Sequence, residues 1–142
     1  MSDAIYNEAI KAAARDRSHA GRLPAPDASV TCDNPLCGDR VTLDVALEAD
    51  RVAAIAHKTR GCLLTEAAAA LLARHAVGRP EAELVPLVQQ VRRFLDGGTA
   101  PWPELDLFAP ARQVRSRHDC VLLPFEALSR ALNGETGADD DR

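Results

Sequence analysis

The chain has 142 residues and a net charge of −4, with 46% hydrophobic but only 4% aromatic residues. This size fits one domain with a largely aliphatic core, and the negative charge argues against nonspecific binding to nucleic acid. No apolar run approaches the roughly 18 residues that a membrane span needs, and the acidic start MSDAIYNEAI does not resemble a signal peptide. We therefore expect a cytoplasmic protein that binds neither membrane nor nucleic acid.

The first third of the chain predicts a helix, a loop and a short strand. Residues 4–15 are rich in helix formers, and the loop that follows is marked by one glycine and two prolines between positions 21 and 26. A short strand is expected over residues 28–32. The buried face of the helix is expected to carry Ile5, Ala9 and Ala12 or Ala13.

Residues 40–58 predict a β-hairpin. The alternation of Val41, Leu43, Val45 and Leu47 with more polar residues such as Asp44 is typical of a strand that is buried on one face. Residues 49–50 make the turn, and the second strand follows directly. An antiparallel sheet of this kind can expose its other face to water.

The next segments have helical periodicity. Helices are expected over residues 62–77 and 80–96, with Gly78 ending the first and Pro80 beginning the second. Because Pro86 falls about two turns into the second helix, its start is expected to be kinked or displaced. The apolar stripe of this helix consists of Leu84, Leu87, Val88, Val91 and Leu95.

The C-terminal part predicts a connector, a helix and a tail. Residues 97–115 form a long connector that Trp102 and Phe108 are expected to pin to the core. A last helix over residues 124–132 closes a single domain, which we expect to span residues 1–133. The stretch 134–142 is polar and is expected to be disordered.

Three of the four cysteines fall at the ends of predicted elements. Cys37 lies in the loop before the hairpin, Cys62 at a helix start, and Cys120 just before the helix predicted to begin near Pro124. In a reducing compartment such cysteines are more typical of metal binding, sulfur chemistry or simple burial than of disulfides. The N-terminal end of a helix favours an anion, so Cys62 and Cys120 are expected to form thiolates readily.

Asp39 is a candidate for a fourth ligand beside these cysteines. Zinc takes four ligands from cysteine, histidine and carboxylate, and iron–sulfur clusters are bound mainly by thiolates. Gly38 allows the backbone to bend so that Cys37 and Asp39 point into one site, although Asp39 is equally explained as a turn residue before a strand. The C-x2-C pair of zinc fingers is absent, so a metal site would have to be assembled by the fold.

The segments NPLCGD, RGCLLTEAAAALL and RHDCVLLPFEALSRAL, in this order, resemble the U-type iron–sulfur assembly scaffolds, the family of IscU, SufU and the N-terminal domain of NifU. The resemblance covers most of the chain and implies an α+β fold, a small antiparallel three-stranded sheet packed on one face by about four helices. The chain looks closest to the SufU type. Arg117 stands three residues before Cys120, an insertion surrounds PWPELDLF, and Asp119 replaces the IscU-type histidine.

This resemblance implies that Cys37, Asp39, Cys62 and Cys120 bind zinc or iron, or a transient [2Fe–2S] cluster. Cys37 is our candidate for the persulfide acceptor, because a loop thiol can swing towards a partner. The implied partners are a SufS-like cysteine desulfurase and recipient apo iron–sulfur proteins. Three functions remain open: a scaffold without independent turnover, a zinc-dependent sulfurtransferase that never holds a cluster, and a family fold whose zinc is purely structural.

The remaining candidates have simpler explanations beside the functional ones. We interpret Cys32 as strand packing, with a spare thiol for sulfur or metal exchange as the alternative. His118 is close enough to Cys120 in sequence to approach a metal, but a solvent-facing loop position is favoured. His57 is expected at the surface and His75 at the edge of the core.

Three further residues lie near the expected site or in the N-terminal loop. Arg60 and Arg117 flank the cysteines and would either attract an incoming persulfide or be ordinary surface arginines. His19 lies in the N-terminal loop, and we do not expect it to be a ligand.

Overall fold

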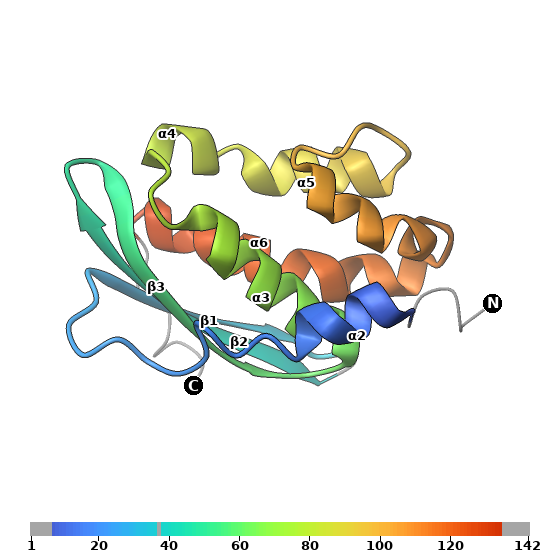
Figure 1. Ribbon diagram of the computed structural model, residues 1–142, viewed down its shortest axis with the longest axis horizontal. Coiled ribbons are helices and arrows are strands. Elements are labelled where there is room, and N and C mark those ends of the chain that lie inside the picture. The colour runs from blue at the N-terminus through green and yellow to red at the C-terminus, as the bar shows by residue number, and fades with distance from the viewer. Residues whose placement is uncertain (1–6, 37, 135–142) are drawn as a thin grey trace.

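A single antiparallel sheet carries helices on one face in the computed structural model, which describes residues 7–36 and 38–134 (Figure 1). The predicted α+β fold with a three-stranded sheet is confirmed. The elements are α2 (Glu8–Ala14), β1 (Ala28–Asn34), β2 (Asp39–Glu48), β3 (Arg51–Arg60), α3 (Leu63–Ala76), α4 (Glu81–Leu84), α5 (Leu87–Leu95), η1 (Pro103–Gln113), η2 (Arg115–Arg117) and α6 (His118–Leu132).

The sheet has the order β1-β2-β3, and its neighbouring strands are antiparallel. The turn of the β2–β3 hairpin is formed by Ala49 and Asp50, whose φ angles of 53° and 63° are those of a tight hairpin turn. On the face that meets the helices, Val30, Leu43 and His57 lie side by side on the three strands. The predicted hairpin is therefore confirmed, and its register fixes which side chains reach the core.

The helices form a layer over this face (Figure 1). α6 packs on β1 and β2, α3 packs on β3, α2 packs on α3, and α5 packs on α6. The five residues of the predicted stripe over 84–95 are all buried, and the helix is divided at Pro86 into α4 and α5. No helix in residues 7–36 and 38–134 is both long enough and apolar enough to cross a membrane.

The face of the first helix that meets the core is only partly the one that we expected. The predicted Ala13 is buried in α2 together with Ile10 and Ala14, whereas Ala9 and the alternative Ala12 are exposed. Ile10 is the largest apolar side chain of this helix, so its burial decides which face turns inward. Ile5, which anchored the predicted face, lies outside the described residues, as does the predicted tail apart from Gly134.

The long connector is helical and not irregular. Residues 103–113 form the 3-10 helix η1, and the short turn η2 follows before α6. Trp102 and Phe108 are buried, as predicted, and the Trp102 ring stacks on His75 with a centroid separation of 4.8 Å. The connector thus becomes a packed part of the domain.

The outer face of β2 is not fully open to water, because the loop after α2 crosses it. Asp44 is completely buried there and accepts hydrogen bonds from Arg22 Nε at 2.7 Å, from Leu23 N–H at 3.0 Å and from the Ser29 hydroxyl. Burial alone would raise the pKa of Asp44, but these donors outweigh it and hold the pKa below its usual value. The alternation over residues 41–47 correctly predicted which face of β2 is buried. It did not predict that the loop after α2 covers the opposite face.

The last helix begins earlier than predicted. α6 starts at His118, so Pro124 lies inside it and Cys120 is in its first turn instead of before it. A proline at this position removes the N–H that would bond the carbonyl of Cys120. Burial of the side chains from 120 to 125 against the sheet compensates for this loss.

Candidate metal centre

The stretch NPLCGD forms the connection between β1 and β2. Asn34 and Asp39 are paired residues at the ends of these strands. The side-chain oxygen of Asn34 accepts a hydrogen bond from Leu36 N–H at 3.1 Å, and the main-chain carbonyl of Asn34 accepts one from Gly38 N–H at 2.8 Å. Gly38 has a φ of +75°, which glycine adopts without strain. Cys37 itself lies outside the described residues.

Three of the four predicted ligands converge in the structure. One carboxylate oxygen of Asp39 and the sulfur atoms of Cys62 and Cys120 all lie within 4.8 Å of one another. They come from the start of β2, the residue that caps α3, and the first turn of α6. Two thiolates bound to one zinc ion at 2.3 Å would be about 3.8 Å apart. The three groups therefore need only a small contraction to share one ion.

No second group of this kind is found in the part of the chain that the structure describes. Asp39 and Cys120 are buried, with exposed fractions of 2% and 1%, whereas Cys62 is half-buried. Asp39 is thus not an ordinary surface turn residue. Among the three described ligands only Cys62, at the start of α3, is half-open, so access to the centre is expected beside it.

The carboxylate of Asp39 is anchored to the first turn of α3. Its Oδ1 accepts a hydrogen bond from Cys62 N–H at 3.0 Å, and its Oδ2 accepts one from the Thr65 hydroxyl at 2.7 Å. The free N–H groups at a helix start stabilise a buried negative charge. These two hydrogen bonds help to stabilise a carboxylate that is buried beside thiols.

Gly61 is the reason that the carboxylate can approach α3 so closely. A Cβ atom at position 61 would lie only 2.6 Å from Asp39 Oδ1, well inside van der Waals contact. Residue 61 has no positive φ, so the requirement for glycine is steric. The sequence shows Gly61-Cys62 only as a helix start. In the structure it is the place where the start of α3 closely approaches Asp39 of the sheet.

The thiol of Cys62 is activated by its neighbours. A hydrogen bond with Cys120 lowers the pKa of Cys62 to about 6, and the N–H of Thr65 acts in the same direction. Burial and the negative charge of Asp39 oppose this shift. At neutral pH Cys62 is therefore mainly thiolate, which is the form that binds metals and attacks sulfur.

The fourth cysteine is separate from this group. Cys32 lies on β1 with 4% of its surface exposed, and its sulfur accepts a hydrogen bond from Arg130 Nη1 at 3.2 Å. Burial raises the pKa of its thiol. This placement agrees with strand packing.

Two histidines differ from the prediction. His57, expected at the surface, is 5% exposed on the core face of β3, and burial, with smaller effects of Arg17 and His19, lowers its pKa to about 4. His118, expected in a solvent-facing loop, is half-buried at the start of α6, with its Nε2 2.9 Å from the carbonyl oxygen of Arg112. Neither belongs to the group of converging ligands. The cause is the same in both cases: a neighbouring segment covers the predicted surface position.

The other flanking residues lie where the sequence suggested. His75 is at the edge of the core against Trp102, and His19 is in the loop after α2. Arg60 is exposed at the end of β3, one residue before Gly61, and Arg117 is half-buried in η2.

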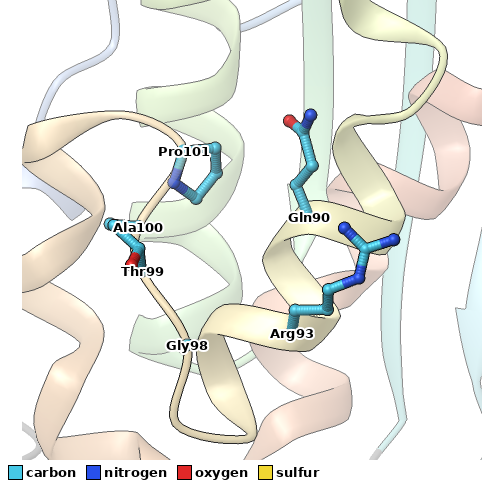
Figure 2. A pocket seen from close by; sticks show the side chains of 6 residues that line it. All are labelled: Gln90, Arg93, Gly98, Thr99, Ala100 and Pro101. Atoms are coloured by element: carbon cyan, nitrogen blue, oxygen red, sulfur yellow. The ribbon is translucent and has the colours of Figure 1, made fainter.

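The hollow beside α5 is not the metal centre. It has a volume of about 410 Å³, and Figure 2 shows Gln90 and Arg93 on α5 at one side of it and the segment 98–101 at the other. Its lining contains no cysteine, histidine or carboxylate. The hollow therefore adds no ligand to the group formed by Asp39, Cys62 and Cys120.

Comparison with known proteins identifies the family. The sequence profile of the NifU-like N terminal domain matches residues 5–102, which is more than half of the chain. The chain belongs to this family. The match includes the segments around Cys37 and Cys62 but ends before Cys120, so the NifU-like assignment does not depend on the third cysteine.

Individual relatives extend the likeness over nearly all of this NifU-like chain. The iron-sulfur cluster assembly scaffold protein IscU of Streptococcus pyogenes serotype M1 is 25% identical over 138 residues, which cover 94% of this chain and 86% of the relative. The crystal structure of a nitrogen-fixing NifU-like protein (N-terminal) from Brucella abortus has a TM-score of 0.87 and 31% identity, covering 93% of this chain and 94% of that one.

A third comparison concerns the fold alone. A putative iron-sulfur cluster assembly scaffold protein for the SUF system from Fervidobacterium islandicum AW-1 has a TM-score of 0.84 at 21% identity, covering 90% of this chain and 96% of that one. The fold is therefore shared with solved structures that carry NifU-like and SUF names.

Two residues of this centre were not predicted, Gly61 as a close contact and Thr65 as a hydrogen-bond partner of Asp39. Thr65 follows Cys62 by three positions, which places both side chains on one face of a helix. It is also the only polar residue that is buried in α3, whose other buried residues are alanine and leucine. A hydroxyl in such a stripe signals a nearby polar partner.

Replacing Gly61 by alanine is expected to lower the zinc affinity of the NifU-like domain by at least about tenfold, because the added Cβ displaces the Asp39 carboxylate. Zinc affinity is measured by competition with a chelator. Gly134→Ala is the control, since it strains a residue with a φ of +85° at the end of α6 and away from the centre. An unchanged affinity in Gly61→Ala would contradict this account of the contact.

The reactivity of Cys62 in metal-free protein is expected to rise with pH with a midpoint near 6, and not near the ordinary value of 9.0. Alkylation is followed by mass spectrometry of the peptide that contains Cys62. Cys120→Ala removes the main hydrogen bond and should move the midpoint upwards. A midpoint that does not respond to this substitution would show that Cys120 does not activate Cys62.

Proposed function

We propose that this NifU-like protein is a scaffold for iron–sulfur cluster assembly, which accepts sulfur from a SufS-like cysteine desulfurase and passes sulfur or a cluster to recipient apo-proteins in the cytoplasm. The convergence of Asp39, Cys62 and Cys120 in one centre supports this most directly. The relative from Streptococcus pyogenes carries the name of such a scaffold.

Cys37 is proposed as the fourth ligand of the centre. It is joined to Asp39 through Gly38 alone, so the chain itself keeps its thiol close to the other three groups. Three thiols and one carboxylate suit zinc or iron. A bound ion would hold the thiols as thiolates at neutral pH.

Sulfur transfer to Cys37 is proposed as a thiol exchange. The Cys37 thiolate attacks the outer sulfur of the persulfide on the desulfurase, and a new S–S bond forms on Cys37. The S–S bond of the donor breaks, and the desulfurase cysteine leaves as a thiolate. The transferred sulfur keeps its oxidation state, so this exchange needs no external oxidant or reductant.

Asp39 is proposed to keep the centre labile. A carboxylate is a harder ligand than a thiolate, so zinc or iron in a sulfur-rich site binds it less strongly than a thiolate. Both of its oxygens already accept hydrogen bonds from the first turn of α3. Release of the metal or cluster therefore leaves this carboxylate satisfied and not an orphaned buried charge.

A zinc-dependent sulfurtransferase that never holds a cluster is the second candidate. Two leucines follow Cys62 at the start of α3, and Leu64 is fully buried. Such bulky side chains would leave less room for a [2Fe–2S] cluster than for a single zinc ion. The close approach of the three ligand groups suits a single ion. The SufU-type features at Arg117 and Asp119 favour the same reading, in which zinc remains bound during sulfur transfer.

Anaerobic reconstitution with ferrous iron, cysteine, a cysteine desulfurase and a thiol reductant, which converts persulfide sulfur to sulfide, tests the proposal. A scaffold is expected to gain visible absorbance and about two irons per chain, as in a [2Fe–2S] cluster. Cys37→Ala should abolish both cluster formation and sulfur acceptance, while Cys32→Ala serves as the matched control and should retain them.

Other outcomes distinguish the alternatives. Stimulation of the desulfurase with zinc retained and no cluster formed would favour the sulfurtransferase. If zinc stays bound but neither stimulation nor a cluster is seen, the metal is purely structural and the proposed function is wrong. If Cys37→Ala keeps full sulfur acceptance, Cys37 is not the acceptor.

A further inference from the structure

Thr65 is the polar residue of α3 whose burial needs an explanation. Its side chain is completely buried in a helix face otherwise made of alanine and leucine. A buried hydroxyl is costly unless it forms hydrogen bonds. The contacts that the structure gives it are with two groups of the candidate centre, Asp39 Oδ2 at 2.7 Å and Cys62 Sγ at 3.4 Å.

The direction of the shorter bond follows from the chemistry of its partners. An ionised carboxylate can only accept hydrogen bonds, so the Thr65 hydroxyl donates to Asp39 Oδ2. The other oxygen, Oδ1, accepts from Cys62 N–H at 3.0 Å. Because both oxygens accept hydrogen bonds, the carboxylate cannot rotate freely.

We propose that Thr65 is a positioning residue that orients the Asp39 carboxylate for metal binding at the centre formed with Cys62 and Cys120. The inference rests on the proposed function only in that the centre binds a metal. The donor on Oδ1 is a backbone N–H, which substitution cannot remove. The hydrogen bond from the Thr65 hydroxyl, in contrast, can be removed by substitution.

Two substitutions separate positioning from packing. Valine nearly matches threonine in shape but cannot donate a hydrogen bond, so Thr65→Val keeps the packing and loses the contact with Asp39. Serine keeps the hydroxyl but lacks the methyl group, so Thr65→Ser keeps the contact and leaves a small cavity. A purely structural role would make serine the more harmful change, whereas positioning makes valine the more harmful one.

The measurement is the affinity for zinc alone, determined on the full chain by competition with a chelator. Thr65→Val is expected to weaken zinc binding by about 10- to 100-fold, as is usual when the hydrogen-bond partner of a ligand is lost. Thr65→Ser should stay within about threefold of the wild type. Unfolding by denaturant shows whether each variant keeps its stability, and the absorption spectrum of the cobalt(II) form reports a change of geometry.

A double-mutant cycle with Asp39→Ala decides whether Thr65 acts through that carboxylate. In the Asp39→Ala background, Thr65→Val is expected to cause little further loss of affinity. An equal loss in both backgrounds, or wild-type affinity in Thr65→Val, would overturn the inference while leaving the proposed function intact. If the wild-type protein binds neither zinc nor iron, the proposed function itself fails.

Discussion

The carboxylate of Asp39 joins the sheet to the first turn of α3, and the geometry of the candidate centre depends on this junction. Asp39 is the first residue of β2, and its two oxygens accept hydrogen bonds from Cys62 N–H and from the Thr65 hydroxyl. Gly61 leaves the space for this approach, because any larger residue would collide with Oδ1. The thiol of Cys62 is thereby placed beside the carboxylate, within reach of Cys120 on α6.

The junction also reconciles two opposing demands on the site. A buried carboxylate must be stabilised, and the helix start and the Thr65 hydroxyl provide donors for it. A site that releases its metal or cluster must not bind too tightly, and a carboxylate among thiolates meets this condition. Thiolate character at Cys62, favoured by Cys120, then supplies the affinity for metal.

Much of this arrangement was predictable from short-range patterns. The alternation over residues 41–47 predicted the hairpin, and the change of period after Cys62 predicted α3. The position of cysteines at element ends, together with Asp39, predicted the three groups that the structure brings together. These signals are local, since each depends on a few neighbouring residues.

The errors arose where distant segments decide the environment. Asp44 is buried by the loop after α2, whose contacting residue Leu23 lies 21 positions earlier in the chain, and His57 is covered on the face that meets the helices. The last helix was predicted to begin at Pro124, but α6 begins six residues earlier, at His118, and residues 120–125 are buried in it. The role of Thr65 depends on a contact between α3 and β2, residues 26 positions apart, which no periodicity reveals.

The ligand sphere of the metal tests the central claim most directly. X-ray absorption spectroscopy at the zinc edge on the zinc-loaded protein should show three sulfur ligands near 2.3 Å and one oxygen ligand near 2.0 Å. In Asp39→Ala the oxygen contribution from the carboxylate should be lost or replaced by water, with the sulfur shell unchanged. A shell of oxygen and nitrogen ligands alone, or four sulfurs in the wild type, would contradict a centre built from Asp39 and the cysteines 37, 62 and 120.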